Sequence, residues 1–147
     1  MVINKLTNEE CESLLQKAAL ARLACALDNQ PYVIPIYVAY DKGSLYALST
    51  LGQKIEWMRT NPRVCLQVDE IQNNEHWTSV IVNGHYQELP EPKYTDERNR
   101  AKKLLEQRHR WWQVAMAERQ MTAGEHLIDP LFFRIRIDSM TGLRASS

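Results

Sequence analysis

Short runs in which apolar and polar residues alternate dominate the chain, and they predict β-strands. A period of two places alternate side chains on opposite faces of a sheet, so each run has one face suited to a core. Turn residues such as Asp28-Asn29-Gln30-Pro31 separate the early runs. The pattern predicts six strands: Arg22–Leu27, Tyr32–Tyr40, Ser44–Ser49, Arg63–Asp69, Trp77–Tyr86 and Leu131–Asp138.

Helical spacing is found in three segments. A capping-box pattern at Thr7–Glu10 starts one short helix, and a second short helix ends at Asn61-Pro62. A longer, highly charged helix is predicted from Thr95 to about Arg119, and its Trp111 and Trp112 are expected to pack on the barrel or on a second subunit. Because the strands are too closely spaced for helical crossovers, we expect a mainly β fold, an antiparallel barrel with flanking helices.

Proline and glycine interrupt two of the predicted strands. Pro35 has no N–H group for a sheet hydrogen bond, so its strand is expected at an edge or at a bulge, where backbone groups stay free for a ligand. Ordinary blunting of a sheet edge is the alternative. Gly84 indicates a bulge or bend near the end of its strand. A polar loop is expected over residues 71–75, and a turn at Met140-Thr141-Gly142.

Size and charge narrow the class of protein. The 147 residues are expected to form one domain, 1–147. The chain has 18 Lys and Arg against 18 Asp and Glu, and zero net charge argues against nucleic acid or an anionic membrane as the partner. Its apolar runs are shorter than a membrane span, and the first residues lack the apolar segment of a signal peptide. Cys11, Cys25 and Cys65 lie in apolar patterns, so reduced thiols in a cytoplasmic protein are expected.

The stretch from Tyr46 to Met58 carries the polar residues best suited to binding. It is predicted to run from a strand end through a turn into a helix. The N-terminus of a helix has unpaired N–H groups and a partial positive charge, which favour a phosphate or another anion. Ser49, Thr50, Gln53 and Lys54 surround that point. The alternative is an ordinary strand-to-helix connection whose lysine faces water.

Groups for other kinds of catalysis are not evident in the sequence. The four histidines lack the spacing of a metal site, and no Ser-His-Asp grouping or G-x-S-x-G motif is found. We therefore predict no metal and assign no catalytic residue. A phosphorylated flavin would suit the chain, because a flavin brings its own chemistry and needs only to be held, tuned and shielded. Its ring would lie at Pro35 to Tyr37, and Trp77 and Ser79 could line the same cavity.

Four motifs follow one another in an order that is informative as a set. They are P-Y-V-I-P, L-Y-x-x-S-x-x-G-x-K, N-P-R-V and S-V-x-V-x-G, all within residues 20–90, and the last strand adds a looser match. The set resembles the pyridoxamine 5′-phosphate oxidase-like, FMN-binding split-barrel superfamily, in particular its nitroimidazole-resistance-type branch. This resemblance implies a six-stranded split β-barrel of Greek-key type, and a homodimer with FMN at the subunit interface.

The resemblance also implies the flavin contacts, position by position. They are Pro35, Ile36 and Tyr37 for the ring, Leu48, Ser49 and Thr50 for the ribityl chain, Gln53 and Lys54 for the phosphate, and Ser79 for a further polar contact.

Two positions depart from the family pattern. Where this chain has Gln53 the oxidases usually have arginine, and where it has Leu48 the nitroimidazole-type proteins often have histidine. The arginine-rich substrate motif of the oxidases is also absent, so pyridoxamine phosphate is not the expected substrate. We expect an FMN-dependent oxidoreductase acting on an unknown small molecule. The alternatives are a non-catalytic carrier of flavin or haem, a deazaflavin-binding protein, and a dimeric barrel without cofactor.

Overall fold

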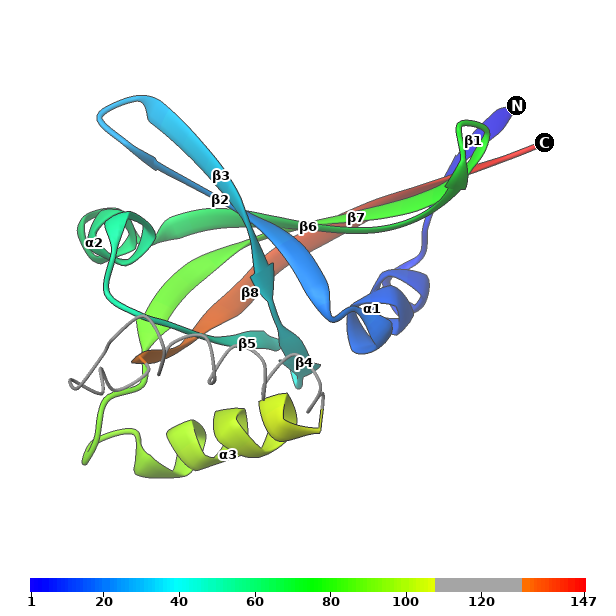
Figure 1. Cartoon of the computed structure of the whole chain (residues 1–147). Coiled ribbons are helices and arrows are strands. Elements are labelled where there is room, and N and C mark those ends of the chain that lie inside the picture. The colour runs from blue at the N-terminus through cyan, green and yellow to red at the C-terminus, as the bar shows by residue number, and fades with distance from the viewer. Residues whose placement is uncertain (108–130) are drawn as a thin grey trace, which may run out of the picture.

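An antiparallel sheet that curls into a split barrel forms the centre of the molecule (Figure 1). A computed structural model describes residues 1–107 and 131–147. The helices are α1 (Asn8–Lys17), α2 (Gln53–Thr60) and α3 (Thr95–Glu106). The strands are β1 (Val2–Lys5), β2 (Leu20–Leu27), β3 (Gln30–Tyr37), β4 (Ala39–Asp41), β5 (Ser44–Ser49), β6 (Arg63–Asn73), β7 (His76–Glu88) and β8 (Leu131–Ser146).

The strand order explains how the sheet closes. Neighbours follow the path β3-β2-β6-β7-β8-β5-β4, and β1 pairs with β8. β3 and β4 lie at opposite ends of this path although they are consecutive in sequence. A single residue, Val38, separates them, and its N–H donates to the carbonyl of Ala19 at 2.9 Å. Pro35 therefore lies on an end strand, which is one of the two positions, edge or bulge, that its missing N–H group predicted.

The predicted antiparallel barrel with flanking helices is confirmed, but the count of six strands is wrong. The described residues form eight strands, because β1 was not predicted and the run Tyr32–Tyr40 is divided at Val38. The loop expected over 71–75 is wrong in part, since β6 continues to Asn73. The turn expected at Met140-Thr141-Gly142 is also wrong. These residues continue β8, because β7 pairs with them along one edge.

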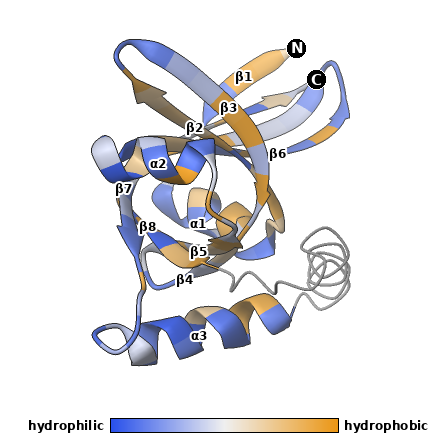
Figure 2. Ribbon diagram, turned by 60° about the vertical axis from the view of Figure 1, so that its left-hand side comes forward, coloured by the Kyte–Doolittle hydropathy of each residue, from blue (hydrophilic) through white to orange (hydrophobic). Residues whose placement is uncertain are grey.

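The alternating runs place one face of each strand in the barrel interior. Leu23, Leu66, Val68, Val80 and Val82 are almost completely buried there. Both short helices add to the same core: α1 through Cys11, Leu14 and Leu15, and α2 through Ile55 and Met58. In the view of Figure 2, α1 is seen within the ring of strands. The predicted capping box of α1 is confirmed, with Thr7 and Glu10 each bonded to the other's main chain.

Helix α3 packs on the outside of the barrel and makes a second, smaller core. Ala101 and Leu105 are buried against Tyr46, Leu89 and Phe132. In Figure 1 this helix runs beside β4 and β5. The long charged helix predicted from Thr95 begins there as α3, and its predicted continuation to about Arg119, with Trp111 and Trp112, falls outside the described residues.

The other face of β3, β2, β6, β7 and β8 is called the outer face below. Successive cross-strand pairs place Pro35, Arg22, Gln67, Ile81 and Thr141 in one row across it. Several large apolar side chains on this face are 42 to 63% exposed: Leu20, Val33, Tyr37, Ile81 and Leu143. The outer face is therefore apolar in large part but open to solvent.

Gly84 is expected to tolerate no side chain. The register shifts between Asn83 and Gly84, which confirms the predicted bulge, and a Cβ atom on Gly84 would lie 2.3 Å from the main-chain oxygen of Arg136. We expect Gly84→Ala to lower the free energy of unfolding by about 1–3 kcal/mol through this overlap, measured by urea denaturation. Gly52→Ala is the control, because the space around Gly52 is open. Equal stability of the two variants would contradict the prediction.

Candidate functional site

The N-terminus of α2 is open to an anion. Its N-cap residue is Gly52, which has no side chain to bond the first N–H groups, whereas the first turn of α1 is closed by Thr7. Helical N–H groups without a partner and the helix dipole attract negative charge. Ser49, Thr50, Gln53 and Lys54 stand around this end, which we call the cradle.

Lys54 is the cation of the cradle. It is half-buried and lies close enough to β2 to act on Cys25, whose thiol pKa is raised by burial and drawn partly back by the lysine charge. Gln53 is exposed and uncharged, so the helix N-terminus has one adjacent cation from this pair. The Ser49 side chain is 2% exposed and donates to the main-chain oxygen of Thr50 at 3.0 Å. In this arrangement Ser49 stiffens the turn.

Helix α2 is anchored at its other end. Arg59 forms an ion pair with Glu88, and the Tyr86 hydroxyl donates to the same carboxylate at 2.8 Å. Burial raises the pKa of Tyr86, so it stays a neutral donor at neutral pH. The amide of Asn61 donates to the Ala26 carbonyl at 2.9 Å, which ties the helix end to β2. These bonds hold the cradle in place before any ligand arrives.

The predicted ring-binding segment lies on the end strand β3. Pro35 and Tyr37 are exposed, with Pro35 on the outer face, while Ile36 is buried in the core. Ile36 can thus meet a ligand only through its main chain. Leu48 also packs away from the cradle, because its side chain contacts the second core beneath α3. A histidine at that position would point the same way.

Trp77 and Ser79 are not brought to the cradle. Both lie on β7, three strands from β3, a separation of about 14 Å at the usual strand spacing. Trp77 pairs with Ile71 and Ala145, close to the tip of the β6–β7 hairpin. From the sequence, Trp77 and Ser79 could have lined the same cavity as the ring, but within one chain the sheet places them three strands from β3.

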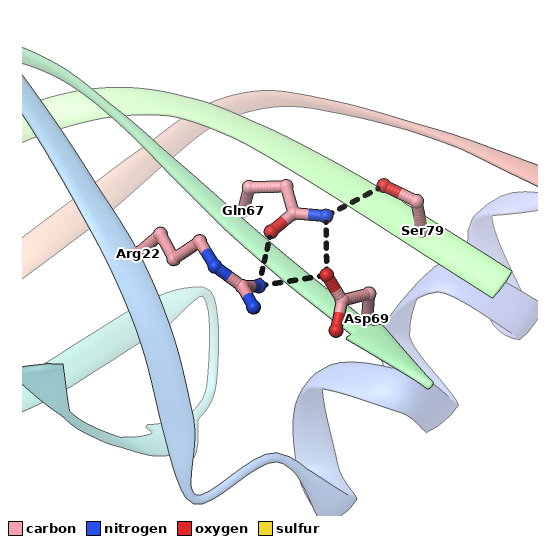
Figure 3. Close-up of polar contacts among 4 residues, drawn as sticks. All are labelled: Arg22, Gln67, Asp69 and Ser79. Atoms are coloured by element: carbon pink, nitrogen blue, oxygen red, sulfur yellow. Dashed lines mark hydrogen bonds and ion pairs between the residues drawn. The ribbon is translucent and has the colours of Figure 1, made fainter. Parts of the chain in front are cut away.

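Three residues that the sequence did not single out join Ser79 to the β3 side (Figure 3). Arg22 Nη1 donates to Gln67 Oε1 at 2.9 Å and to Asp69 Oδ2 at 2.7 Å. The Gln67 amide donates to Asp69 Oδ2 at 2.9 Å and to Ser79 Oγ at 3.0 Å. We call these four residues the outer-face network. Their polar positions in alternating runs were visible in the sequence, but their partnership depends on the register of β2, β6 and β7.

Metal and thiol chemistry find no support in the part of the chain that the structure describes. Within residues 1–107 and 131–147 there is no group of three or more potential metal ligands. All three cysteines are free, and burial raises the pKa of Cys11, Cys25 and Cys65, which disfavours a reactive thiolate. Among the same residues, no helix has the length and apolar character to cross a membrane.

The fold is that of a split β-barrel protein, and the cradle at the N-terminus of α2 is its candidate site for an anion. The chain belongs to the family described as pyridoxamine 5′-phosphate oxidase, which matches residues 7–144. An uncharacterised protein of Rhizobium meliloti (strain 1021) is 41% identical over 150 residues, covering 99% of this chain and 97% of that protein.

Two solved structures are similar to this chain over its whole length. A FAD-binding protein from Mesorhizobium loti is 40% identical, with a TM-score of 0.81 over 100% of this chain and 99% of that one. A candidate 5-nitroimidazole antibiotic resistance protein from Bacteroides thetaiotaomicron is 19% identical, with a TM-score of 0.67 over 100% and 93% of the two chains. The second likeness concerns the fold alone. The resemblance to the pyridoxamine 5′-phosphate oxidase-like family that was inferred from the sequence motifs is confirmed.

Gln67 is expected to stabilise the outer face more than an ordinary surface amide. Its side chain takes part in three hydrogen bonds, so Gln67→Met should lower the free energy of unfolding by about 1–2 kcal/mol. Gln30→Met is the matched control, because that amide is exposed and donates only to Pro31 next to it. Urea denaturation of both variants measures the difference. A Gln67 variant as stable as the Gln30 variant would show that the network adds nothing to folding.

Proposed function

We propose that the protein binds a flavin nucleotide, specifically FMN, and that it is an oxidoreductase that uses this flavin to oxidise or reduce a small molecule. The observation that carries this proposal is the uncapped N-terminus of α2, with Lys54 beside it. The phosphate would lie at the cradle, held by main-chain N–H groups, Lys54, Gln53 and Thr50. The 40% identical protein from Mesorhizobium loti, a FAD-binding protein, supports a flavin.

The ring would lie along the main chain of Pro35, Ile36 and Tyr37. The charge of Lys54 acts on Cys25, and Cys25 pairs with Tyr32 on β3. Pro35 lies three residues after Tyr32, which is about 10 Å along the strand. A phosphate and a ring joined by a ribityl chain suit such a separation. When bound, the flavin supplies electron and hydride transfer, and the chain holds and shields it. No side chain of the cradle is assigned a catalytic role.

The cofactor has alternatives that an experiment separates. FAD has the same phosphate and ring, with an added adenosine part. Haem needs an axial ligand such as histidine, cysteine, methionine or tyrosine, and among the proposed contacts only Tyr37 is of that kind. A haem carrier, a deazaflavin protein and a barrel without cofactor stay predictions, as does a cytoplasmic location.

A homodimer with the cofactor at the subunit interface is part of the proposal. Ser79 and Trp77 lie about three strand spacings from β3, so they would reach the flavin of a second copy more readily than that of their own chain. The exposed apolar residues of the outer face, such as Ile81 and Leu143, would be covered by such a partner.

The absorption spectrum of the purified protein tests the central claim. The protein is titrated with FMN, FAD and haemin in separate experiments, and the titrations with FMN and FAD should give flavin bands that persist through gel filtration. A Soret band alone would favour the haem carrier. Absence of bound colour, together with an unchanged melting temperature at saturating flavin, would overturn the proposal. Reduction of the bound flavin by NADH or NADPH then separates an enzyme from a carrier.

Two neighbouring substitutions are expected to change flavin affinity in opposite directions. Lys54→Met removes a charged phosphate contact and should weaken FMN binding by about 1.5–3 kcal/mol. Gln53→Arg adds a second cation and should tighten it by about 0.5–1.5 kcal/mol. Fluorescence titration measures both. Lys103→Met, on the exposed side of α3, is the control and should bind FMN as the natural protein does. Unchanged affinity in Lys54→Met would make that residue an ordinary surface lysine.

Disruption of the outer face is expected to separate the proposed dimer. Ile81 is 42% exposed in the single chain, and Ile81→Lys would place a charge in an apolar interface. Sedimentation velocity should show a dimer for the natural protein and a shift toward monomer for this variant. Val2→Lys is the control for an exposed apolar residue, because Val2 pairs with Ser146, which points to the opposite side of β8 from Leu143. A natural protein that sediments as a monomer at all concentrations would refute the dimer.

A further inference from the structure

Arg22 stands beside the proposed ring-binding segment. It is the direct cross-strand partner of Pro35, so its side chain lies on the same face of the sheet as Pro35. Its side chain is 53% exposed, and Nη1 donates to both Gln67 and Asp69. Within the described residues, Nε and Nη2 have no hydrogen-bond partner. The structure therefore holds a guanidinium in a fixed position and leaves three of its five N–H donors available.

The other residues of the outer-face network determine the net charge around Arg22 as well as the position of its side chain. The side chain of Asp69 is only 18% exposed, and it accepts from Gln67 as well as from Arg22. Gln67 is tied in turn to Ser79. An arginine held by two partners loses less freedom on meeting a third group than a mobile one does. Asp69 also offsets part of the positive charge that Arg22 presents to its surroundings.

A cation in this position acts on one redox state of a flavin. Two-electron reduction with uptake of one proton leaves the ring with one negative charge, centred on N1 and the C2 carbonyl. The oxidised ring is neutral. A guanidinium close to the ring therefore stabilises the reduced form selectively, and a nearby carboxylate opposes that effect.

We propose that Arg22, oriented by Gln67 and Asp69, binds the polar edge of the flavin ring and sets the balance between its oxidised and reduced forms. Asp69 limits the effect. This inference rests on the proposed function, because it requires a ring at Pro35–Tyr37. Its consequence is a chemical preference: a site that stabilises reduced flavin favours uptake of electrons from a donor such as a reduced nicotinamide.

The affinities for oxidised and for dithionite-reduced FMN, measured anaerobically by titration, test the proposal. We expect Arg22→Gln to shift the ratio of the two affinities about tenfold toward the oxidised form. Asp69→Asn, which keeps the shape of the side chain, should shift the ratio in the opposite direction. Arg22→Lys keeps the charge and should stay closer to the natural protein than Arg22→Gln does. The spectroscopic midpoint potential gives the same comparison independently.

Arg144→Gln is the matched control. Arg144 is 48% exposed and forms one ion pair of 2.7 Å with Glu10, and Arg22 is 53% exposed and lies 2.7 Å from Asp69. The two arginines differ in their partners, because Glu10 lies on α1. Its substitution should leave the ratio unchanged.

Each possible outcome decides one claim. Opposite shifts for the Arg22→Gln and Asp69→Asn variants support the proposal, because a merely structural role would not produce opposite signs. Equal ratios in all variants, with FMN still bound, overturn the role of Arg22 and leave the flavin site intact. Failure of the natural protein to bind either form of FMN overturns the proposed function itself.

Discussion

Closure of one sheet around a shared interior is the constraint on which the rest of this structure depends. Because side chains alternate along a strand, each residue that enters the barrel core places its neighbours on the outer face. The ends of the interior are filled by α1 and α2, whose buried residues join the same core as the strands. Only Val38 lies between β3 and β4, the two ends of the strand path. This closure leaves β3 as an end strand and places α2 beside it. The proposed site uses both, with the ring-binding segment on β3 and the cradle at the N-terminus of α2.

The two short helices show how similar local signals lead to different roles. The capping box of α1 satisfies its first N–H groups within the chain. Gly52 leaves the same groups of α2 without a side-chain partner, which costs some helix stability and creates a place for an anion. Arg59, Tyr86 and Asn61 anchor the opposite end of α2. The helix is thus stabilised by tertiary contacts at one end, while its other end stays available.

The outer face combines two properties that rarely occur together without a partner. Its apolar side chains are open to solvent, and its centre holds a charged pair within a chain of hydrogen bonds. Placed against a second copy and a flavin, the apolar positions would be covered and the arginine would lose water, which strengthens its electrostatic effect. Ser79 lies apart from the cradle, which argues against a site within one chain. In a site shared by two chains, Ser79 would instead contact the flavin of the second copy.

The sequence by itself determined the class of fold, the capping of α1, the end position of Pro35, the bulge at Gly84 and the cradle as a candidate site. These are local features, since periodicity, a proline and a capping pattern act through near neighbours in the chain. The count of strands failed where distant pairing extends a strand, as β7 does for Met140-Thr141-Gly142. Only the tertiary structure decided that Leu48 faces α3, that Trp77 and Ser79 lie apart from Lys54, and that Arg22 meets Asp69. Those relations depend on the register between strands, which is fixed by packing of the whole barrel core and is written in no single segment of the chain.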